Sequence, residues 1–379
     1  MNKRRVVFVT GTRADFGKLK PLMRVLAESG GFELTAFTTG MHMLARHGLT
    51  VNEVIKSSLA EVYPFFNQGG ADGTSMEGAL AATIQGLSHF VRERAPDLLV
   101  VHGDRIEALA GAIVGALNNV LVAHVEGGEL SGTVDELIRH AVSKMSHVHF
   151  GANEEACHRL RRMGERADCV HVIGSPDIDV MMSPDLPPLR DVLEHYEIPF
   201  TDYGILLYHP VTTSLGDLPA RANRLVDAVL DSGRRFVVIA PNNDHGSADI
   251  VRALRRLDDV TRFRHLPSFR FEAFLVLLRE AQAIVGNSSA GIREAPVYGV
   301  QTINLGTRQN NRFKHSSILD LDEYDPCLPS TLAGMGKRYP ASHYFGDGRS
   351  AARFLAVLQS EQFWAVSAQK QFDDIPDSA

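Results

Sequence analysis

Short apolar runs rich in β-branched residues alternate with amphipathic segments of helical length in the first half of the chain. The runs occupy residues 5–10, 34–38, 97–101, 120–124 and 147–150. Leu98-Leu99-Val100-Val101 is apolar without interruption, which is typical of a parallel strand covered by helices on both faces. We therefore predict a doubly wound α/β domain.

The same alternation restarts after a stretch between Ser183 and Asp202 that is rich in Pro and acidic residues. Strands are predicted at residues 205–208, 235–239, 283–285 and 301–305, with helices beginning near Leu218, Ala248, Phe271 and Gly291. Beyond Pro340 the pattern is helical to about Phe372. The predicted organisation is two Rossmann-like doubly wound α/β domains, residues 1–182 and 183–350, facing one cleft, and a terminal helix, residues 351–379, that returns to the first domain.

Composition and charge exclude several classes of protein. The 379 residues are 44% hydrophobic and 22% charged, without an apolar run near the roughly 20 residues of a membrane helix. Three separate cysteines argue against a disulfide framework, so we expect a cytoplasmic protein. A net charge of -6 without a long basic stripe argues against a nucleic-acid partner.

Ligands of open parallel sheets bind beyond the carboxyl ends of the strands. The first predicted strand ends in a glycine-marked turn, residues 11–18, which carries Arg13 and Lys18 and resembles a phosphate cradle. It is not a Walker A loop, because its spacing is one residue too long and Leu19 replaces the hydroxyl residue. The alternative is a tight strand-to-helix turn with solvated cations.

Acidic residues follow two neighbouring strands. Asp104 comes after His102-Gly103, and Glu126 precedes two glycines. We interpret them as a converging carboxylate cluster, in which like charges and desolvation raise at least one pKa and so suit proton abstraction. Asp135 and Glu136 open a predicted helix, where a helix-dipole role is the alternative.

The second domain offers His209 after a strand and the small-residue turn 286–291 before a helix. The amides and hydroxyls of that turn suit phosphates at a helix N-terminus, and Glu294 is placed to accept ribose hydroxyls. Arg308 adds a cation after the next strand. The alternatives are a structural histidine and a helix capped by Ser288 or Ser289.

Taken in order, these motifs resemble the hydrolysing UDP-N-acetylglucosamine 2-epimerases of bacterial sialic-acid synthesis, nearly from end to end. The matching segments are Gly11-Thr12-Arg13-Ala14-Asp15, Thr39-Gly40-Met41-His42, His102-Gly103-Asp104-Arg105, Glu126-Gly127-Gly128-Glu129, His209-Pro210-Val211-Thr212-Thr213, Asn287-Ser288-Ser289 and Gly306-Thr307-Arg308-Gln309.

The resemblance implies a glycosyltransferase B type fold, with UDP held mainly by the second domain and chemistry in the first. It implies that Asp104, Glu126 and Asp135 are the catalytic acids and His209 the active-site histidine. It also implies a UDP-sugar substrate without a redox cofactor. The sequence shows no metal-ligand spacing, so we expect no metal site, and we expect a homodimer. The residues expected around the UDP-sugar are Arg13, Lys18, His42, Arg105, Asn242, Asp244, Phe274, Ser288, Ser289, Glu294 and Arg308.

Non-hydrolysing relatives carry a Gly-His-Arg type sequence where this chain has Tyr208-His209-Pro210, so the resemblance favours the hydrolysing branch. The implied reaction eliminates UDP to a 2-acetamidoglucal and hydrates it to free N-acetylmannosamine. The alternative substrate is a UDP-2,4-diacetamido-2,4,6-trideoxy sugar of legionaminic-acid synthesis. A glycosyltransferase or a non-catalytic UDP-sugar sensor would not need the three acids.

Overall fold

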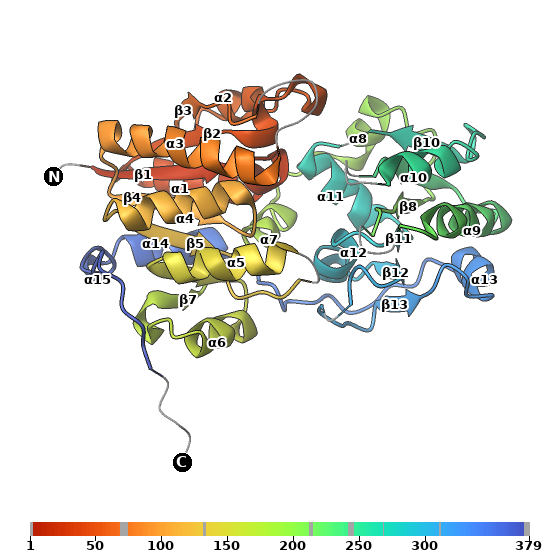
Figure 1. Ribbon diagram of the computed structural model, residues 1–379. Coiled ribbons are helices and arrows are strands. Elements are labelled where there is room, and N and C mark those ends of the chain that lie inside the picture. Colours follow the sequence, from red (N-terminus) through yellow and green to blue (C-terminus); the bar gives the residue numbers. More distant parts are fainter. Residues whose placement is uncertain are drawn as a thin grey trace, which may run out of the picture. The chain divides into compact units, whose positions relative to one another are not determined.

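The computed structural model describes residues 3–68, 75–131, 134–211, 215–241, 246–267, 269–310 and 312–374. The chain forms two compact units (Figure 1). The first contains Met1–Ser183 together with Tyr344–Ala379, and the second is the continuous stretch Pro184–His343. The sequence pattern suggested divisions after residues 182 and 350.

The first unit is built on a parallel sheet of seven strands in the order β3-β2-β1-β4-β5-β6-β7. Its strands are β1 Arg4–Thr10, β2 Phe32–Thr38, β3 Glu61–Pro64, β4 Leu98–His102, β5 Leu121–Val125, β6 Val148–Gly151 and β7 Val170–Val172. Because all strands are parallel, the residues that follow β1, β4 and β5 lie at one edge of the sheet.

Helices cover both faces of this sheet. Side chains alternate across a strand, so Val6 and Phe8 of β1 pack in one apolar cluster while Val7 and Val9 pack in another on the opposite face. The helical segments of the main part are α1 Arg13–Ser29, η1 Gly40–Met43, η2 Ala45–His47, α2 Val51–Ser57, α3 Met76–Arg94, α4 Ile106–Leu117, α5 Val134–Met145, α6 Glu154–Arg162, η3 Ala167–Cys169 and α7 Pro176–Met181.

The end of the chain returns to the first unit, which confirms that prediction. Helix α14 (Ser350–Leu358) buries Phe354 in the cluster that contains β1, and the Phe354 ring lies 4.7 Å from that of Phe150. Helix α15 (Glu361–Trp364) follows it. The expectation of helix up to about Phe372 was wrong, because residues 365–374 are irregular.

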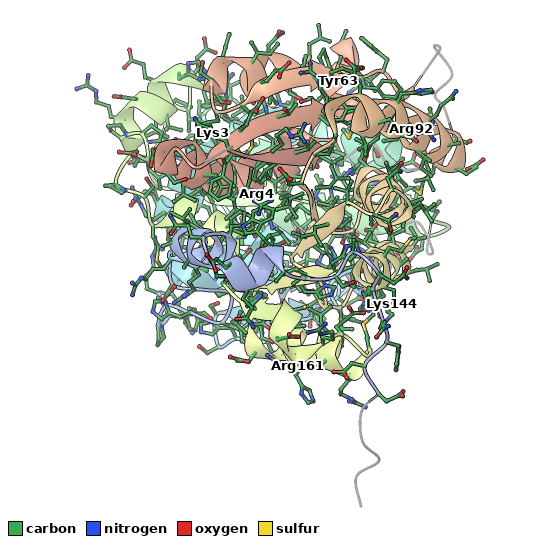
Figure 2. The ribbon with its side chains drawn as sticks, turned by 90° about the vertical axis from the view of Figure 1, so that its left-hand side faces the viewer. Lys3, Arg4, Tyr63, Arg92, Lys144 and Arg161 are labelled. Atoms are coloured by element: carbon green, nitrogen blue, oxygen red, sulfur yellow. The ribbon has the colours of Figure 1, made fainter. Side chains whose placement is uncertain are left out.

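This irregular tail is nevertheless fixed. The Lys144 ammonium lies 4.7 Å from the centre of the Phe372 ring, and at the end of α15 the Arg4 guanidinium lies 4.6 Å from that of Trp364. Figure 2 labels Arg4 and Lys144. Lys370 pairs with the buried Glu165 at 2.5 Å. Its ammonium also donates to three carbonyl oxygens at the end of α5, those of Ser143, Lys144 and Ser146. These bonds satisfy carbonyls that a helix end leaves without an intrahelical partner.

Glu165 is the ionic centre of this tail contact. It accepts hydrogen bonds at 2.8 Å from Lys144 and from His149. Burial opposes ionisation of this carboxyl, but the hydrogen bonds from His149, Lys144 and Lys370 lower the pKa of Glu165 to about 2.

The second unit is built on six parallel strands in the order β10-β9-β8-β11-β12-β13. They are β8 Gly204–Leu207, β9 Phe236–Ile239, β10 Phe263–Leu266, β11 Ala283–Gly286, β12 Gln301–Leu305 and β13 Ile318–Leu321. The helical segments are α8 Leu189–His195, α9 Leu218–Asp231, α10 Ser247–Leu254, α11 Phe271–Glu280, α12 Ala290–Arg293, η4 Ala295–Tyr298 and α13 Leu328–Ala333.

The stretch interpreted as a linker contains helix α8. Its Val192 is buried, with Leu189 and Leu193 packed beside it in a core of the second unit. The surrounding prolines led to the prediction of a linker, although Leu189, Val192 and Leu193 have the spacing of one helical face. Within the described parts of the chain, no helix is long and apolar enough to cross a membrane.

Candidate active site

The turn after β1 is closed by its own aspartate. Asp15 accepts hydrogen bonds from the backbone N–H groups of Gly11, at 2.9 Å, and Thr12, at 3.1 Å. The Thr10 hydroxyl donates to the same carboxylate at 2.5 Å, and Thr12 caps α1 by accepting from the Asp15 N–H. In this structure the Gly11, Thr12 and Asp15 amides of the predicted phosphate cradle are therefore occupied from within the loop.

His42 belongs to the same internal network. Its side chain has no exposed surface, and its two ring nitrogens contact the hydroxyls of Thr10 at 3.0 Å and Thr50 at 2.7 Å. Burial lowers its pKa, against the opposing effect of nearby Asp15 and Glu53. In this structure His42 therefore braces the loop after β1 with a neutral ring.

The predicted cations of the first unit are paired with acids. Arg13 forms a two-pronged ion pair with Glu53 on α2. Arg105 donates to the buried Glu107 at 3.2 Å. A Cβ on Gly11 would lie 2.6 Å from the Glu107 carboxyl carbon, so this glycine is required by the close approach of that side chain.

Glu126 is the most constrained of the candidate acids. It follows β5 with a left-handed backbone (φ 60°), a conformation that is costly for a residue with a side chain and is concentrated at functional sites. Its buried carboxylate contacts Lys18 at 3.2 Å and His102 at 3.1 Å, and it accepts a hydrogen bond from the Ser175 hydroxyl. These contacts fix both oxygens of the carboxylate.

Asp104 lies at the neighbouring strand end. β4 and β5 are paired, so Asp104 and Glu126 leave adjacent strands of the sheet. The Asp104 carboxylate pairs with Arg139 of α5, whose guanidinium also lies 3.5 Å from Glu129. Asp135 is exposed in the first turn of α5, one helical turn before Arg139. The structure thus ties Asp104, one of the three predicted acids, to the helix that carries Asp135.

His124 was not singled out by sequence reasoning, yet it holds these elements together. It is fully buried on β5 and donates from Nε2 to the Gly103 carbonyl at 2.8 Å. Its Nδ1 lies 3.0 Å from the Ser143 hydroxyl of α5. Burial keeps its pKa well below the usual value, so the ring is neutral and acts as a fixed cross-link between the Asp104 turn and α5.

Asn287 organises the corresponding edge of the second sheet. Its side-chain oxygen accepts from the His209 N–H at 2.7 Å, and its side-chain nitrogen donates to the His209 carbonyl at 2.8 Å. The Asn287 carbonyl accepts from Arg308 at 3.1 Å and from Gln309 at 2.9 Å. One buried residue therefore joins the segments that follow β8, β11 and β12.

The serine turn differs in part from its prediction. Helix α12 is a single turn of four residues, and Ser289 at its N-cap makes no capping hydrogen bond. Ser288 accepts from the Ala290 N–H at 3.3 Å. Both serines are half-buried, whereas Glu294 is buried just after α12. A helix this short contributes little dipole, so an anion here would depend on local amides and hydroxyls.

Of the remaining predicted residues, the structure describes Phe274 but not Asn242 or Asp244. Phe274 is half-buried on α11 and packs against a core of the second unit. Asn242 and Asp244 lie outside the described residues, as do Thr212 and Thr213 of the histidine motif. Over the described ranges, no group of three or more His, Cys, Asp or Glu side chains is arranged to hold a metal ion.

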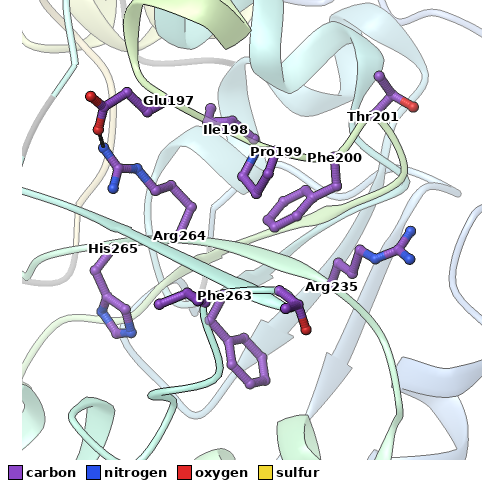
Figure 3. Close-up of a pocket in the computed structure, with 11 residues that line it drawn as sticks. Glu197, Ile198, Pro199, Phe200, Thr201, Arg235, Phe263, Arg264 and His265 are labelled. Carbon is purple, nitrogen blue, oxygen red and sulfur yellow. Dashed lines mark hydrogen bonds and ion pairs between the residues drawn. The ribbon is translucent and has the colours of Figure 1, made fainter.

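A cavity of about 1000 Å³ opens at the other edge of the second sheet (Figure 3). Its walls come from residues 197–201 before β8, Arg235 before β9 and the start of β10. Arg264 is paired across it with Glu197 at 2.8 Å. Because the strands are parallel, this cavity lies at the amino edge, away from His209 and Asn287.

A family model described as UDP-N-acetylglucosamine 2-epimerase matches residues 24–359. The chain belongs to the UDP-N-acetylglucosamine 2-epimerase family. The motif resemblance is thereby confirmed for this enzyme family, and the predicted pair of Rossmann-like doubly wound sheets is confirmed by the structure.

Individual relatives agree with this family assignment. The chain is 47% identical to a UDP-N-acetylglucosamine 2-epimerase of Neisseria meningitidis serogroup B, over 98% of this chain and 99% of that one. It is 33% identical to a hydrolysing UDP-N,N'-diacetylbacillosamine 2-epimerase of Legionella pneumophila, over 94% and 96%. A crystal structure of a UDP-GlcNAc 2-epimerase from Neisseria meningitidis bound to UDP-GlcNAc matches with a TM-score of 0.75 and 16% identity, covering 93% and 99%. That likeness concerns the fold.

Proposed function

We propose that this protein is a hydrolysing 2-epimerase that converts UDP-N-acetylglucosamine into UDP and free N-acetylmannosamine. The observation that carries the proposal is the fixed carboxylate of Glu126 beside the Asp104–Arg139 pair at adjacent strand ends. The 47% identity with a UDP-N-acetylglucosamine 2-epimerase supports the substrate, and the Tyr208-His209-Pro210 sequence supports the hydrolysing branch.

The proposed reaction has two halves. Proton removal from C2 and departure of UDP from C1 first give a 2-acetamidoglucal. Water then adds at C1 while a proton is delivered to C2 from the opposite face. Asp104, Glu126 and Asp135 share these proton transfers, each of which contributes typically about 10² to 10⁴ in rate.

In this proposal the second unit holds the nucleotide. Ser288, Ser289 and Arg308 contact the phosphates, and Glu294 accepts the ribose hydroxyls. His209 is presented by Asn287 toward the sugar or its leaving phosphate. Arg13, Lys18, His42, Arg105 and Phe274 stay predicted as further residues of the UDP-sugar site. We further propose that the enzyme acts in the cytoplasm as a homodimer, in sialic-acid synthesis for a capsule or similar polysaccharide.

A second substrate is favoured by one comparison. The relative that is 33% identical is named for a diacetylated bacillosamine sugar, so the UDP-2,4-diacetamido-2,4,6-trideoxy sugar is the competing candidate. The reaction class would be the same, and the contacts at C4 and C6 would differ.

The test is incubation with each UDP-sugar in D₂O containing EDTA, followed by NMR. We expect UDP and one free 2-epimerised sugar in equal amounts, with deuterium at C2. Accumulation of UDP-N-acetylmannosamine would refute the hydrolysing assignment. Preference for the diacetamido sugar would transfer the assignment to the second substrate, and ordinary hydrogen at C2 would exclude proton abstraction.

A further inference from the structure

The turn between β7 and α7 is not part of any motif discussed above, yet it supports Glu126. Ser175 donates from its hydroxyl to the Glu126 carboxylate. Two residues later, Asp177 has no exposed surface and lies 3.0 Å from the Lys18 ammonium, which also contacts Glu126 at 3.2 Å. One ammonium therefore lies between two buried carboxylates.

Asp177 is an unusual buried acid. Neither of its carboxylate oxygens accepts a hydrogen bond of good geometry from any described residue, and Lys18 is the cation that it faces. Burial of a carboxylate without hydrogen bonds is costly, and such groups in native structures call for an explanation.

A purely structural acid on the same helix shows the contrast. Asp179 accepts hydrogen bonds from the Ser350 N–H at 2.9 Å, the Ser350 hydroxyl at 2.7 Å and the Ala351 N–H at 2.8 Å. It thereby anchors the start of α14 to α7. Asp177 makes no comparable bonds among the described residues, so anchoring of this kind does not account for it.

We propose that Asp177 is a positioning residue for Glu126, which holds Lys18 by its ammonium and prevents that cation from pairing with Glu126 alone. The inference deepens the proposed function and rests on it, because it assumes that Glu126 exchanges protons with the sugar. A carboxylate that is fully neutralised by its own lysine is a weak proton acceptor. A carboxylate that shares the lysine with a second anion keeps more of its basicity.

The charges around Glu126 fix the sign of the effect. Among the described residues, Glu126 faces the charged or titratable groups of Lys18 from α1 and His102 from β4, and Asp177 from α7 acts on it through Lys18. Asp177→Asn removes a negative charge, so Glu126 becomes half protonated at lower pH. Lys18→Met removes a positive charge, so the same midpoint moves to higher pH. The double variant removes one charge of each sign, so its Glu126 midpoint should return toward the wild-type value.

The experiment follows the Glu126 carboxyl carbon by ¹³C NMR titration in the full-length chain, assigned with Glu126→Gln, alongside the pH profile of UDP release. We expect opposite midpoint shifts of about one pH unit in the two single variants, the size typical of a charge within about 4–6 Å. kcat should fall at least tenfold in Asp177→Asn with KM changed less than threefold.

Asp179→Asn is the matched control, because it removes the charge of a half-buried carboxylate on the same helix that bonds to Ser350 and Ala351 and not to Lys18. It should lower thermal stability and leave the Glu126 midpoint in place. If Lys18→Met does not fold, Asp177→Asn is compared with Asp177→Glu, because both variants keep the Lys18 cation beside the buried Glu126 carboxylate and only Asp177→Asn removes the second negative charge; the Glu126 midpoint should move in Asp177→Asn alone.

The proposal is overturned if Asp177→Asn behaves like Asp179→Asn, or if both single variants shift the midpoint in the same direction. Failure of the proposed function has a different signature. In that case the wild type releases no UDP from either UDP-sugar, while the ¹³C titration still reports whether Asp177 governs Glu126 through Lys18.

Discussion

Replacement of Asn287 by Ala is expected to loosen the segment after β8 and to reduce turnover. The substitution removes both side-chain hydrogen bonds to the His209 backbone, at 2.7 and 2.8 Å. The carbonyl of residue 287 survives, so its bonds from Arg308 and Gln309 are retained. The perturbation therefore isolates the anchoring of His209 from that of the Arg308 segment.

The size of the effect follows from these two bonds. Each hydrogen bond contributes about 1 kcal/mol net, and the cost grows when a partner is left buried and unsatisfied. His209 is half-buried, so water reaches part of its backbone and we take about 2 kcal/mol in total. For a unit of this size that corresponds to a fall of roughly 4–8 °C in Tm.

Scanning calorimetry and steady-state kinetics measure the two consequences. We expect the Tm of the second unit to fall by that amount and kcat to fall at least tenfold. Asn304→Ala is the matched control, since Asn304 is buried on β12 and bonds with Asp320 at 2.8 Å. It should lower Tm with kcat retained. Equal kinetics for the two variants, or an unchanged Tm for Asn287→Ala, would refute the anchoring role.

Three further predictions concern other residues. Glu294→Ala should raise KM for the UDP-sugar far more than it lowers kcat, because ribose contacts are shared by ground state and transition state; steady-state kinetics test this, and an unchanged KM would contradict it. Asp104→Asn and Asp135→Asn should bind UDP by calorimetry yet lose about 10² to 10⁴ in kcat, with near wild-type turnover as the contrary result. The depressed pKa of Glu165 contributes stability that is present above about pH 4.5 and lost as pH falls toward 2. Denaturation curves between pH 5 and 3 should therefore show a shallower loss for Lys370→Met than for the wild type, and equal slopes would contradict this.

Strand prediction succeeded at the centre of each sheet and failed at its edges. The four strands that the sequence pattern did not reveal are β3, β7, β10 and β13, which are the outermost strands of the two sheets. Edge strands are partly solvated: β3 has no buried residue, and β13 has two exposed residues between half-buried ends. Without a continuous apolar run, their sequences do not differ from those of loops.

Like the strands, the candidate site was predicted only in part from the sequence. Residues that directly follow central strands, such as Asp104, Glu126 and His209, could be located because parallel topology brings strand ends to one edge. Asp177 and His124 were missed, since their importance comes from contacts with Lys18 and Gly103 far away in the chain. Local spacing carries no signal for such contacts.

The second unit is a continuous insertion within the first, and this has a consequence for synthesis on the ribosome. Residues 184–343 emerge and complete their own sheet while the first sheet still lacks Phe354, Leu358 and Phe363 of its core. Domains generally fold as they emerge, so the unit that begins first is the one that finishes last. A nascent chain arrested near residue 343 should contain a protease-resistant second unit and an exposed apolar surface on the first. A premature stop codon between residues 344 and 353 removes Phe354, Leu358 and Phe363, and would therefore prevent folding of the half that carries the candidate acids while the other half folds.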